Sequence, residues 1–238
     1  MDLIHHAQIK HRQFHNPSEV QLCTLLSIKT GGCTENCSYC SQSQSHVETD
    51  VQAQKMVGLD EVMAKAREAK RHGSTRFCMG AAFREMKGRK SALKRIGEMT
   101  CVTLGMIDEE QAKTLKENGL TAYNHNIDTS REHYPNVITT RTYDDACTGG
   151  ILGLGETTED HVGFLHTLSN MSPHPESLPI NRLVPIKGTP ILQFDSILRT
   201  IATARLIMPG SIIRLAAGDK AMLEKWGMKP MESSVSKK

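Results

Sequence analysis

Apolar residues along the chain form two kinds of segment, short continuous runs and stretches with helical spacing, and these alternate along the chain. The apolar run at 22–28 predicts a buried strand, and it leads directly into a glycine-containing loop. Apolar positions at 59–71 recur with helical spacing, with acidic residues early, basic residues late and a glycine behind them, which predicts a helix. A second helix is predicted at 108–118, where Asp108 begins a capping motif.

Shorter apolar runs predict the remaining elements. Strands are expected at 76–79, at 101–105, from 120 onward, and at 149–154, 180–184 and 211–215, with a helix at 197–207. Strands that alternate with helices are typical of α/β proteins with a parallel sheet, so the predicted fold class is α/β. One connection is too short for this pattern. Only three residues separate Tyr143 from Cys147, whereas a crossover with its helix takes about 10 to 12 residues.

Composition indicates one globular domain, because 238 residues with 38% hydrophobic content can form a sizeable core. The apolar runs end well before the roughly 18 to 20 residues that span a bilayer, so no transmembrane segment is expected. A net charge of +3 from intermixed basic and acidic residues does not indicate a nucleic-acid partner. The first residues resemble neither a signal peptide nor a transit peptide. Any targeting segment is therefore expected to have been removed or never to have been present.

Seven cysteines, three of them within 33–40, favour metal ligation in a reducing compartment over disulfides. Cys33, Cys37 and Cys40 have the spacing C-x3-C-x2-C, and three such thiolates can bind three irons of a [4Fe–4S] cluster. The fourth iron is then open to chelate the amino and carboxylate groups of a methionine moiety. The alternatives are a structural zinc site completed by His46, or plain buried thiols. The cluster is favoured because zinc sites more often use C-x2-C pairs.

The residues around these cysteines resemble those of a known family. The segment SIKTGGCTENCSYC at 27–40 is similar to the cluster loop of radical S-adenosylmethionine (SAM) enzymes, and its flanks are similar to the biotin synthase family. The other matching segments are GSTRFCMGAA at 73–82, YNHNIDTS at 123–130, GGILGLGE at 149–156 and PIN at 179–181. The resemblance implies a TIM-type (β/α)8 barrel over residues 1–232, with its chemistry at the C-terminal mouth. A disordered tail is expected at 233–238.

By the same resemblance, the chain is a radical SAM sulfurtransferase that inserts sulfur between two carbons of dethiobiotin to form biotin. Cys33, Cys37 and Cys40 would hold the cluster that reduces bound SAM and splits it into methionine and a 5′-deoxyadenosyl radical. The residues matched to SAM and substrate contacts are Tyr39, Ala81, Asn126, Asp128, Ile151 and Asn181. A carboxylate suits ribose hydroxyls, and an amide suits a cyclic urea. From the residues alone, Tyr39 equally fits ordinary packing, and Asn126 and Asp128 fit loop-capping roles.

A second ligand set separates this family from other radical SAM enzymes. It consists of Cys78, Cys101, Cys147 and Arg214, which match the ligands of a [2Fe–2S] cluster regarded in the family as the sulfur donor. Without the resemblance, three isolated cysteines on predicted strands are interpreted as small buried hydrophobic residues. Arg76 is expected to share a strand face with Cys78, where its charge would lower the cost of burying anionic sulfide. Cys23 matches no ligand and is interpreted as a core residue.

The resemblance also implies partners and a location. A ferredoxin- or flavodoxin-type electron donor and a homodimer are expected, with neither nucleic acid nor membrane as a partner. The closeness to fungal forms implies a mitochondrial location.

Several family segments are missing from this chain. It lacks an N-terminal helix, part of the crossover before Cys101, the whole crossover before Cys147, residues after 188–190, and the last barrel strand between Gly218 and Asp219. The residues that flank these joints are intact. A barrel without its closing strand exposes sheet edges, which favours aggregation. The barrel is therefore expected to be incomplete, and the alternative function is a catalytically inactive, iron–sulfur-binding fragment of the same family.

Overall fold

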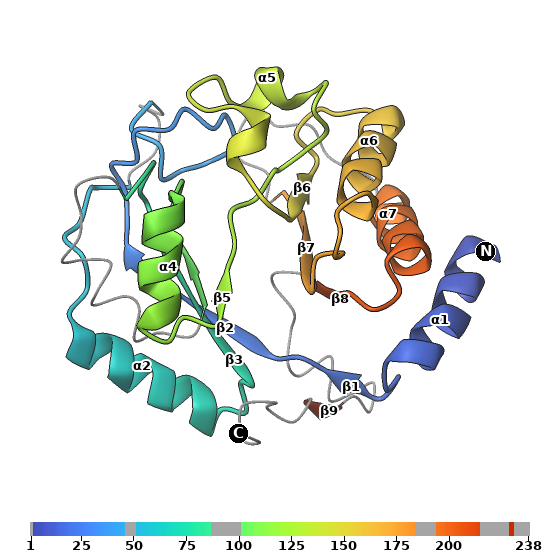
Figure 1. The fold of residues 1–238 in the computed structure, drawn as a ribbon, viewed down its shortest axis with the longest axis horizontal. Helices are drawn as coiled ribbons and strands as arrows, with labels where there is room; N and C mark the ends of the chain where they lie inside the picture. The colour runs from blue at the N-terminus through green and yellow to red at the C-terminus, as the bar shows by residue number, and fades with distance from the viewer. Residues whose placement is uncertain (1, 46–50, 87–100, 184–193, 215–228, 231–238) are drawn as a thin grey trace. The chain divides into compact units, whose positions relative to one another are not determined.

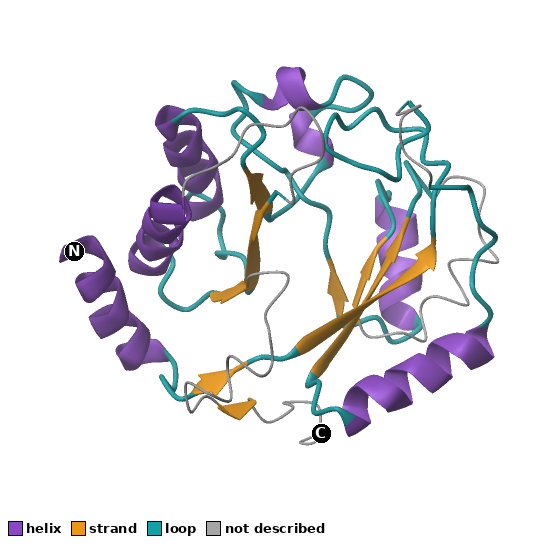
Figure 2. Ribbon diagram, turned by 180° about the vertical axis from the view of Figure 1, so that it is seen from behind, coloured by secondary structure: helices purple, strands orange, loops and turns teal. Residues whose placement is uncertain are grey.

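The computed structural model of this chain describes residues 2–45, 51–86, 101–183, 194–214 and 229–230. The chain divides into two compact units. Unit 1 consists of Met1–Glu19 and Asn126–Met228, and unit 2 consists of Val20–His125 and Lys229–Lys238. Each unit has its own parallel sheet and its own helices, as Figures 1 and 2 show. The α/β class predicted from the sequence is therefore confirmed.

Unit 2 is built on a four-stranded parallel sheet in the order β2-β3-β4-β5. Its strands are β2 (Cys23–Lys29), β3 (Arg76–Ala81), β4 (Cys101–Thr103) and β5 (Ala122–Tyr123). Its helices are α2 (Leu59–Arg71) and α4 (Glu109–Glu117). The predicted strands and both predicted helices of this unit are present. Their apolar residues are spaced so that each element buries one face, which is why the sequence predicts them.

Helix α4 begins as its sequence predicts. The Asp108 carboxylate accepts a hydrogen bond from the Gln111 N–H at 2.8 Å, and the Gln111 side chain accepts one from the Asp108 N–H at 3.1 Å. This capping box satisfies two backbone donors that a helix start otherwise leaves without partners.

One face of the unit 2 sheet forms the core, and both helices cover it. The buried cluster consists of Ile28, Val62, Met79, Met86, Val102, Leu104 and Leu115. Val62 comes from α2 and Leu115 from α4, so the two helices pack on the same side of the sheet. The other face of β2 is open, since Cys23 is exposed and Leu25 is 70% exposed. The prediction of a fully buried β2 is therefore wrong: alternate side chains of a strand point to opposite faces, and only one face is covered here.

Unit 1 carries a three-stranded parallel sheet in the order β6-β7-β8. Its strands are β6 (Gly150–Leu152), β7 (Ser177–Arg182) and β8 (Ile212–Arg214). Its helices are α1 (Asp2–Phe14), α5 (Tyr134–Val137), α6 (Thr158–Ser169) and α7 (Phe194–Ile207), with a short 3-10 helix η1 (Tyr143–Asp145). The expected strands and the helix before β8 are present. As expected, no crossover helix lies between Tyr143 and Cys147, where the chain forms only η1.

Helix α6 was not predicted, although its capping box is visible in the sequence. The Thr157 hydroxyl accepts from the Asp160 N–H at 3.3 Å, and the Asp160 carboxylate accepts from the Thr157 N–H at 2.8 Å. The helix packs closely on β6, because a Cβ at Gly150 would lie 2.6 Å from the Phe164 ring. Only glycine allows this approach of helix and strand.

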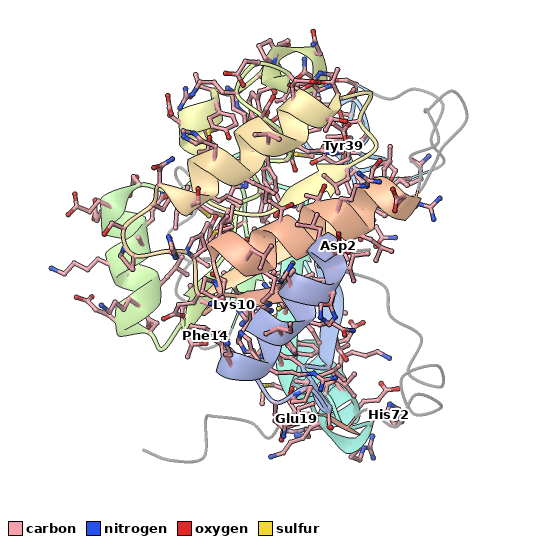
Figure 3. The ribbon with its side chains drawn as sticks, turned by 90° about the vertical axis from the view of Figure 1, so that its right-hand side faces the viewer. Asp2, Lys10, Phe14, Glu19, Tyr39 and His72 are labelled. Atoms are coloured by element: carbon pink, nitrogen blue, oxygen red, sulfur yellow. The ribbon has the colours of Figure 1, made fainter. Side chains whose placement is uncertain are left out.

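The amino end of the chain forms helix α1, which was not predicted from the sequence and which packs against α7. Just beyond the end of α1, Arg205 of α7 donates a hydrogen bond to the His15 ring at 2.7 Å. Within α1, Lys10 lies 5.8 Å from the centre of the Phe14 ring (Figure 3).

Strands β1 (Glu19–Val20) and β9 (Lys229–Pro230) form a two-stranded sheet. Within the described residues, no helix has the length and apolar character needed to cross a membrane. The segments expected to be shortened at 87–100, after 188–190 and around Gly218 lie outside the described residues, as do His46 and the tail at 233–238.

Candidate functional site

The loop after β2 carries Cys33, Cys37 and Cys40, and backbone hydrogen bonds close it on itself. The Cys33 N–H donates to the Gln42 carbonyl at 3.0 Å, and the Gln44 N–H donates to the Cys33 carbonyl at 2.8 Å. The Cys40 N–H donates to the Cys37 carbonyl at 3.1 Å. Cys33 and Cys37 are buried and Cys40 is partly buried. All three cysteines therefore belong to one closed loop at the C-terminal end of β2.

Glycine and buried polar contacts give this loop its shape. Gly31 has a φ of 70°, and a Cβ there would lie 2.6 Å from the Gln52 carbonyl oxygen, so only glycine fits. The Ser43 hydroxyl donates to the Glu35 carbonyl at 2.6 Å, and the largely buried Glu35 carboxylate lies 3.6 Å from Arg84. Tyr39, labelled in Figure 3, lies half-buried in the same loop.

Among the residues that the structure describes, no three His, Cys, Asp or Glu side chains converge as one metal ion would require. A single ion needs its ligands around one point, with thiolates at about 2.3 Å. A [4Fe–4S] cluster binds each thiolate at a different iron, so this finding concerns only single-ion sites.

The face of the unit 2 sheet opposite the helices carries a second group of sulfur atoms, from the exposed Cys23, the half-buried Cys78 and the buried Cys101. We call Cys23, Cys78, Cys101 and Arg76 the thiol face. The Cys78 sulfur lies 3.0 Å from the Cys101 sulfur and 3.3 Å from the Cys23 sulfur. An Arg76 Nη donates to the Cys101 sulfur at 3.3 Å. The expected proximity of Arg76 to this cysteine group is confirmed, whereas the interpretation of Cys23 as a core residue is wrong because its side chain is exposed.

The pKa values of the two paired sulfurs on the thiol face shift in opposite directions. Contacts with the Cys101 and Cys23 sulfurs, together with the Arg76 charge, hold the pKa of Cys78 well below its ordinary value. The contact with Cys78 and burial hold the pKa of Cys101 above its ordinary value.

Three of the predicted site residues share one face of the unit 1 sheet. Ile151 on β6 is the register partner of Asn181 on β7, and Arg214 on β8 is the partner of Pro179. Because Pro179 and Asn181 are two residues apart on one strand, both point to the same face. Ile151, Asn181 and Arg214 therefore line one side of this sheet.

Asp128 lies fully buried beside β6 in an unusual backbone conformation. Its φ is 63°, which non-glycine residues rarely adopt, and its carbonyl accepts from the Ile151 N–H at 2.8 Å. Its carboxylate accepts from Arg141 at 2.9 Å, and both side chains are almost fully buried. The Arg141 Nε also donates to the Tyr134 hydroxyl at 2.8 Å. Arg141 could not be found from sequence patterns, because the pair joins residues on either side of α5.

Asn126 lies near this segment too, since a Cβ at Gly149 would approach its amide oxygen to 2.7 Å. Glu156, at the end of the GGILGLGE segment, accepts from the Gly153 N–H at 2.6 Å and contacts the His161 ring at 2.9 Å. Burial favours the protonated carboxyl, but these two hydrogen bonds outweigh it and hold the pKa of Glu156 below its ordinary value.

The remaining predicted residues are distributed over both units. Ala81 ends β3 opposite Lys29 and packs against the hydrophobic cluster of unit 2. Cys147 lies half-buried between η1 and β6. Of the second ligand set, Cys78 and Cys101 belong to unit 2, whereas Cys147 and Arg214 belong to unit 1.

Comparison with known proteins identifies the family. The profile of the Radical SAM superfamily matches residues 27–150, and that of the Biotin and Thiamin Synthesis associated domain matches residues 179–236. The mitochondrial biotin synthase of Saccharomyces cerevisiae is 56% identical over 304 aligned positions, which cover 98% of this chain and 81% of the relative. The chain belongs to the biotin synthase family. The mitochondrial biotin synthase of Arabidopsis thaliana is 51% identical, with 92% of this chain and 65% of the relative covered.

The alignment with the yeast biotin synthase has more positions than this chain has residues. The relative therefore contains internal residues that this chain lacks, in agreement with the missing segments expected from the sequence. The fold also resembles that of Streptococcus suis SuiB bound to S-adenosylmethionine, with a TM-score of 0.56 and 10% identity over 90% of this chain and 54% of that chain. This likeness fits a partial TIM-like arrangement.

Membership of the biotin synthase family and the Radical SAM match imply a [4Fe–4S] cluster and SAM as cofactors. The donor set of the loop fits this cluster. It offers three thiols on one closed turn of chain, the soft ligands that iron–sulfur clusters select, with no fourth cysteine between residues 33 and 40.

Proposed function

We propose that this chain converts dethiobiotin to biotin by inserting sulfur between two carbons, as a radical SAM sulfurtransferase. The observation that carries the proposal is the combination of a three-cysteine loop and a separate thiol face in a chain 56% identical to a biotin synthase. When bound, the [4Fe–4S] cluster supplies the electron that cleaves SAM and thereby the radical that activates the substrate's C–H bonds.

We further propose that Cys33, Cys37 and Cys40 hold the [4Fe–4S] cluster, and that Tyr39, Ala81, Asn126, Asp128, Ile151 and Asn181 bind SAM and dethiobiotin. The chemistry of two of these residues supports the assignment. The Asp128 carboxylate, which pairs with Arg141, is an acceptor group suited to ribose hydroxyls. The Asn126 amide can both donate to and accept from a cyclic urea.

The second cluster, a [2Fe–2S] centre that donates the sulfur, is assigned to Cys78, Cys101, Cys147 and Arg214. The 3.0 Å between the Cys78 and Cys101 sulfurs supports this assignment, because two thiolates at about 2.3 Å from one tetrahedral metal lie only slightly farther apart. Arg76 supports it as well, since a guanidinium beside the sulfur atoms offsets the negative charge of bound sulfide.

The proposal includes the setting of the reaction. Residues 1–232 would form one radical SAM barrel domain with an incomplete wall, and 233–238 a disordered tail. The protein would act as a homodimer that receives electrons from a ferredoxin- or flavodoxin-type donor. A mitochondrial location is supported by the names of the yeast, Emericella nidulans and Arabidopsis relatives.

Anaerobic reconstitution tests this function. The chain is loaded with iron and sulfide, reduced, and incubated with SAM and dethiobiotin, and 5′-deoxyadenosine and biotin are quantified. We expect both products, loss of both in Cys33→Ala, and loss of biotin with 5′-deoxyadenosine retained in Cys147→Ala. A wild-type protein that holds the [4Fe–4S] cluster but forms neither product would overturn the proposal.

A further inference from the structure

Cys23 is a cysteine that the proposed clusters leave without a role. It is the first residue of β2, its side chain is exposed, and its sulfur lies 3.3 Å from the Cys78 sulfur, with Cys23 as the donor. Cys78 in turn lies 3.0 Å from Cys101. The three sulfurs therefore form a row across three neighbouring strands, with Cys78 in the middle.

The strand register explains why Cys23 belongs to this row. Cys23 is the register partner of Arg76, and Leu25 is the partner of Cys78. Since side chains two residues apart point to the same face, Cys23 and Cys78 are diagonal neighbours on the thiol face. The backbone pairing thus places both side chains on one face, where their sulfurs make the 3.3 Å contact.

We propose that Cys23 is a positioning residue for the second cluster, whose thiol donates a hydrogen bond to the sulfur of the ligand Cys78. This inference rests on the proposed function. Another acceptor near the Cys23 thiol is the Thr24 carbonyl, at 3.8 Å. An anionic ligand sulfur is both nearer and the better acceptor, because hydrogen bonds to charged groups are stronger than those to neutral ones.

The expected consequence is a change in reduction potential. Reduction adds negative charge to the cluster and its ligand sulfurs, and a hydrogen bond to one of those sulfurs stabilises the added charge. The Cys23 hydrogen bond therefore raises the reduction potential of the second cluster. It also directs one sulfur lone pair of Cys78 toward Cys23, which fixes the orientation of the ligand toward its iron.

The test compares Cys23→Ala with Cys23→Ser in the full reconstituted chain. The readouts are the midpoint potential of the second cluster, followed by visible absorbance, and its iron–sulfur stretching frequencies by resonance Raman. We expect Cys23→Ala to lower the potential and shift the stretching frequencies. Cys23→Ser keeps a donor at this position and is expected to restore both toward wild type.

Ser27→Ala is the matched control, because Ser27 is an exposed residue on the same face of β2 whose hydroxyl contacts Thr30. It should leave the potential unchanged. If wild type and Cys23→Ala have the same midpoint potential and the same spectra, the inference is overturned. It is also overturned if neither Cys23 variant assembles the second cluster, because Cys23 would then be a ligand. If the wild-type protein assembles no second cluster, both the proposed [2Fe–2S] centre and this inference are overturned. Unchanged potentials in Cys23→Ala, or loss of the cluster in both Cys23 variants, overturn this inference alone and leave the proposed function in place.

Discussion

The thiol face of unit 2 and the Asp128 segment of unit 1 present their candidate residues in contrasting ways. The sulfurs of Cys23, Cys78 and Cys101 lie along a partly open sheet face and contact mainly one another and Arg76. Asp128, by contrast, is fully buried and fixed by an ion pair with Arg141 and by backbone hydrogen bonds to β6.

The difference follows from the chemistry of the groups. A thiol is a weak polar group that tolerates a partly apolar surface, so a strand pairing is enough to hold it in place. A buried carboxylate has a high desolvation cost and needs a cation and hydrogen bonds in fixed geometry. Unit 1 is therefore expected to depend on individual polar partners for stability, and the thiol face is not.

The Arg141–Asp128 pair gives the largest expected effect. Arg141→Gln leaves the Asp128 charge buried without its cation, so the free energy of unfolding should fall by about 3 to 5 kcal/mol in urea titrations followed by circular dichroism. The control is Arg131→Gln, which removes an exposed ion pair with Asp144 and should cost far less, because solvent screens the pair. If the two variants lost the same free energy of unfolding, burial would not determine how much the Arg141–Asp128 pair stabilises the fold.

Gly150 gives the next largest effect and tests packing in unit 1. The Cβ of Gly150→Ala would lie 2.6 Å from the Phe164 ring, so the α6–β6 contact must widen, at a cost of about 1 to 3 kcal/mol in the free energy of unfolding. Gly210→Ala is the comparison, because no atom lies within 4 Å of its Cβ position. If Gly150→Ala were as stable as Gly210→Ala, α6 would not pack on β6 as closely as described.

Glu156 is expected to make the stability of unit 1 depend on pH. Its hydrogen bonds lower its pKa in the folded state, so the carboxylate stabilises the fold above the ordinary pKa of 4.5, and this contribution is lost as the pH falls through the folded-state value. Wild type should therefore lose more stability than Glu156→Gln as the pH is lowered from 7 through 4 and below. Glu117→Gln, at an exposed carboxylate, should follow wild type over the same range. A pH profile of Glu156→Gln that matched wild type would rule out this role.

The same contrast explains what the sequence could predict. Apolar spacing located β2, α2, α4 and α7, because each buries one face against its own unit. The exposure of Cys23 could not be predicted, since an apolar run such as 22–28 does not reveal which face another element covers. The resemblance grouped Cys78 with Cys101, whose sulfurs lie 3.0 Å apart. Arg141 escaped prediction because its partner lies beyond a loop whose path no periodicity encodes.

Leu25 gives the smallest expected effect and the sharpest test of the open face. Its side chain is 70% exposed among the sulfurs of the thiol face, so Leu25→Ala should change the free energy of unfolding by no more than about 0.5 kcal/mol. Ile28, three residues along the same strand, is 1% exposed on the covered face, and Ile28→Ala should cost about 2 to 5 kcal/mol. If Leu25→Ala cost as much as Ile28→Ala, the thiol face would be covered in solution. The thiols would then lie in an enclosed interior, and the hydrogen bond from Cys23 to Cys78 would be stronger than it is on an open surface, because water would no longer compete for it.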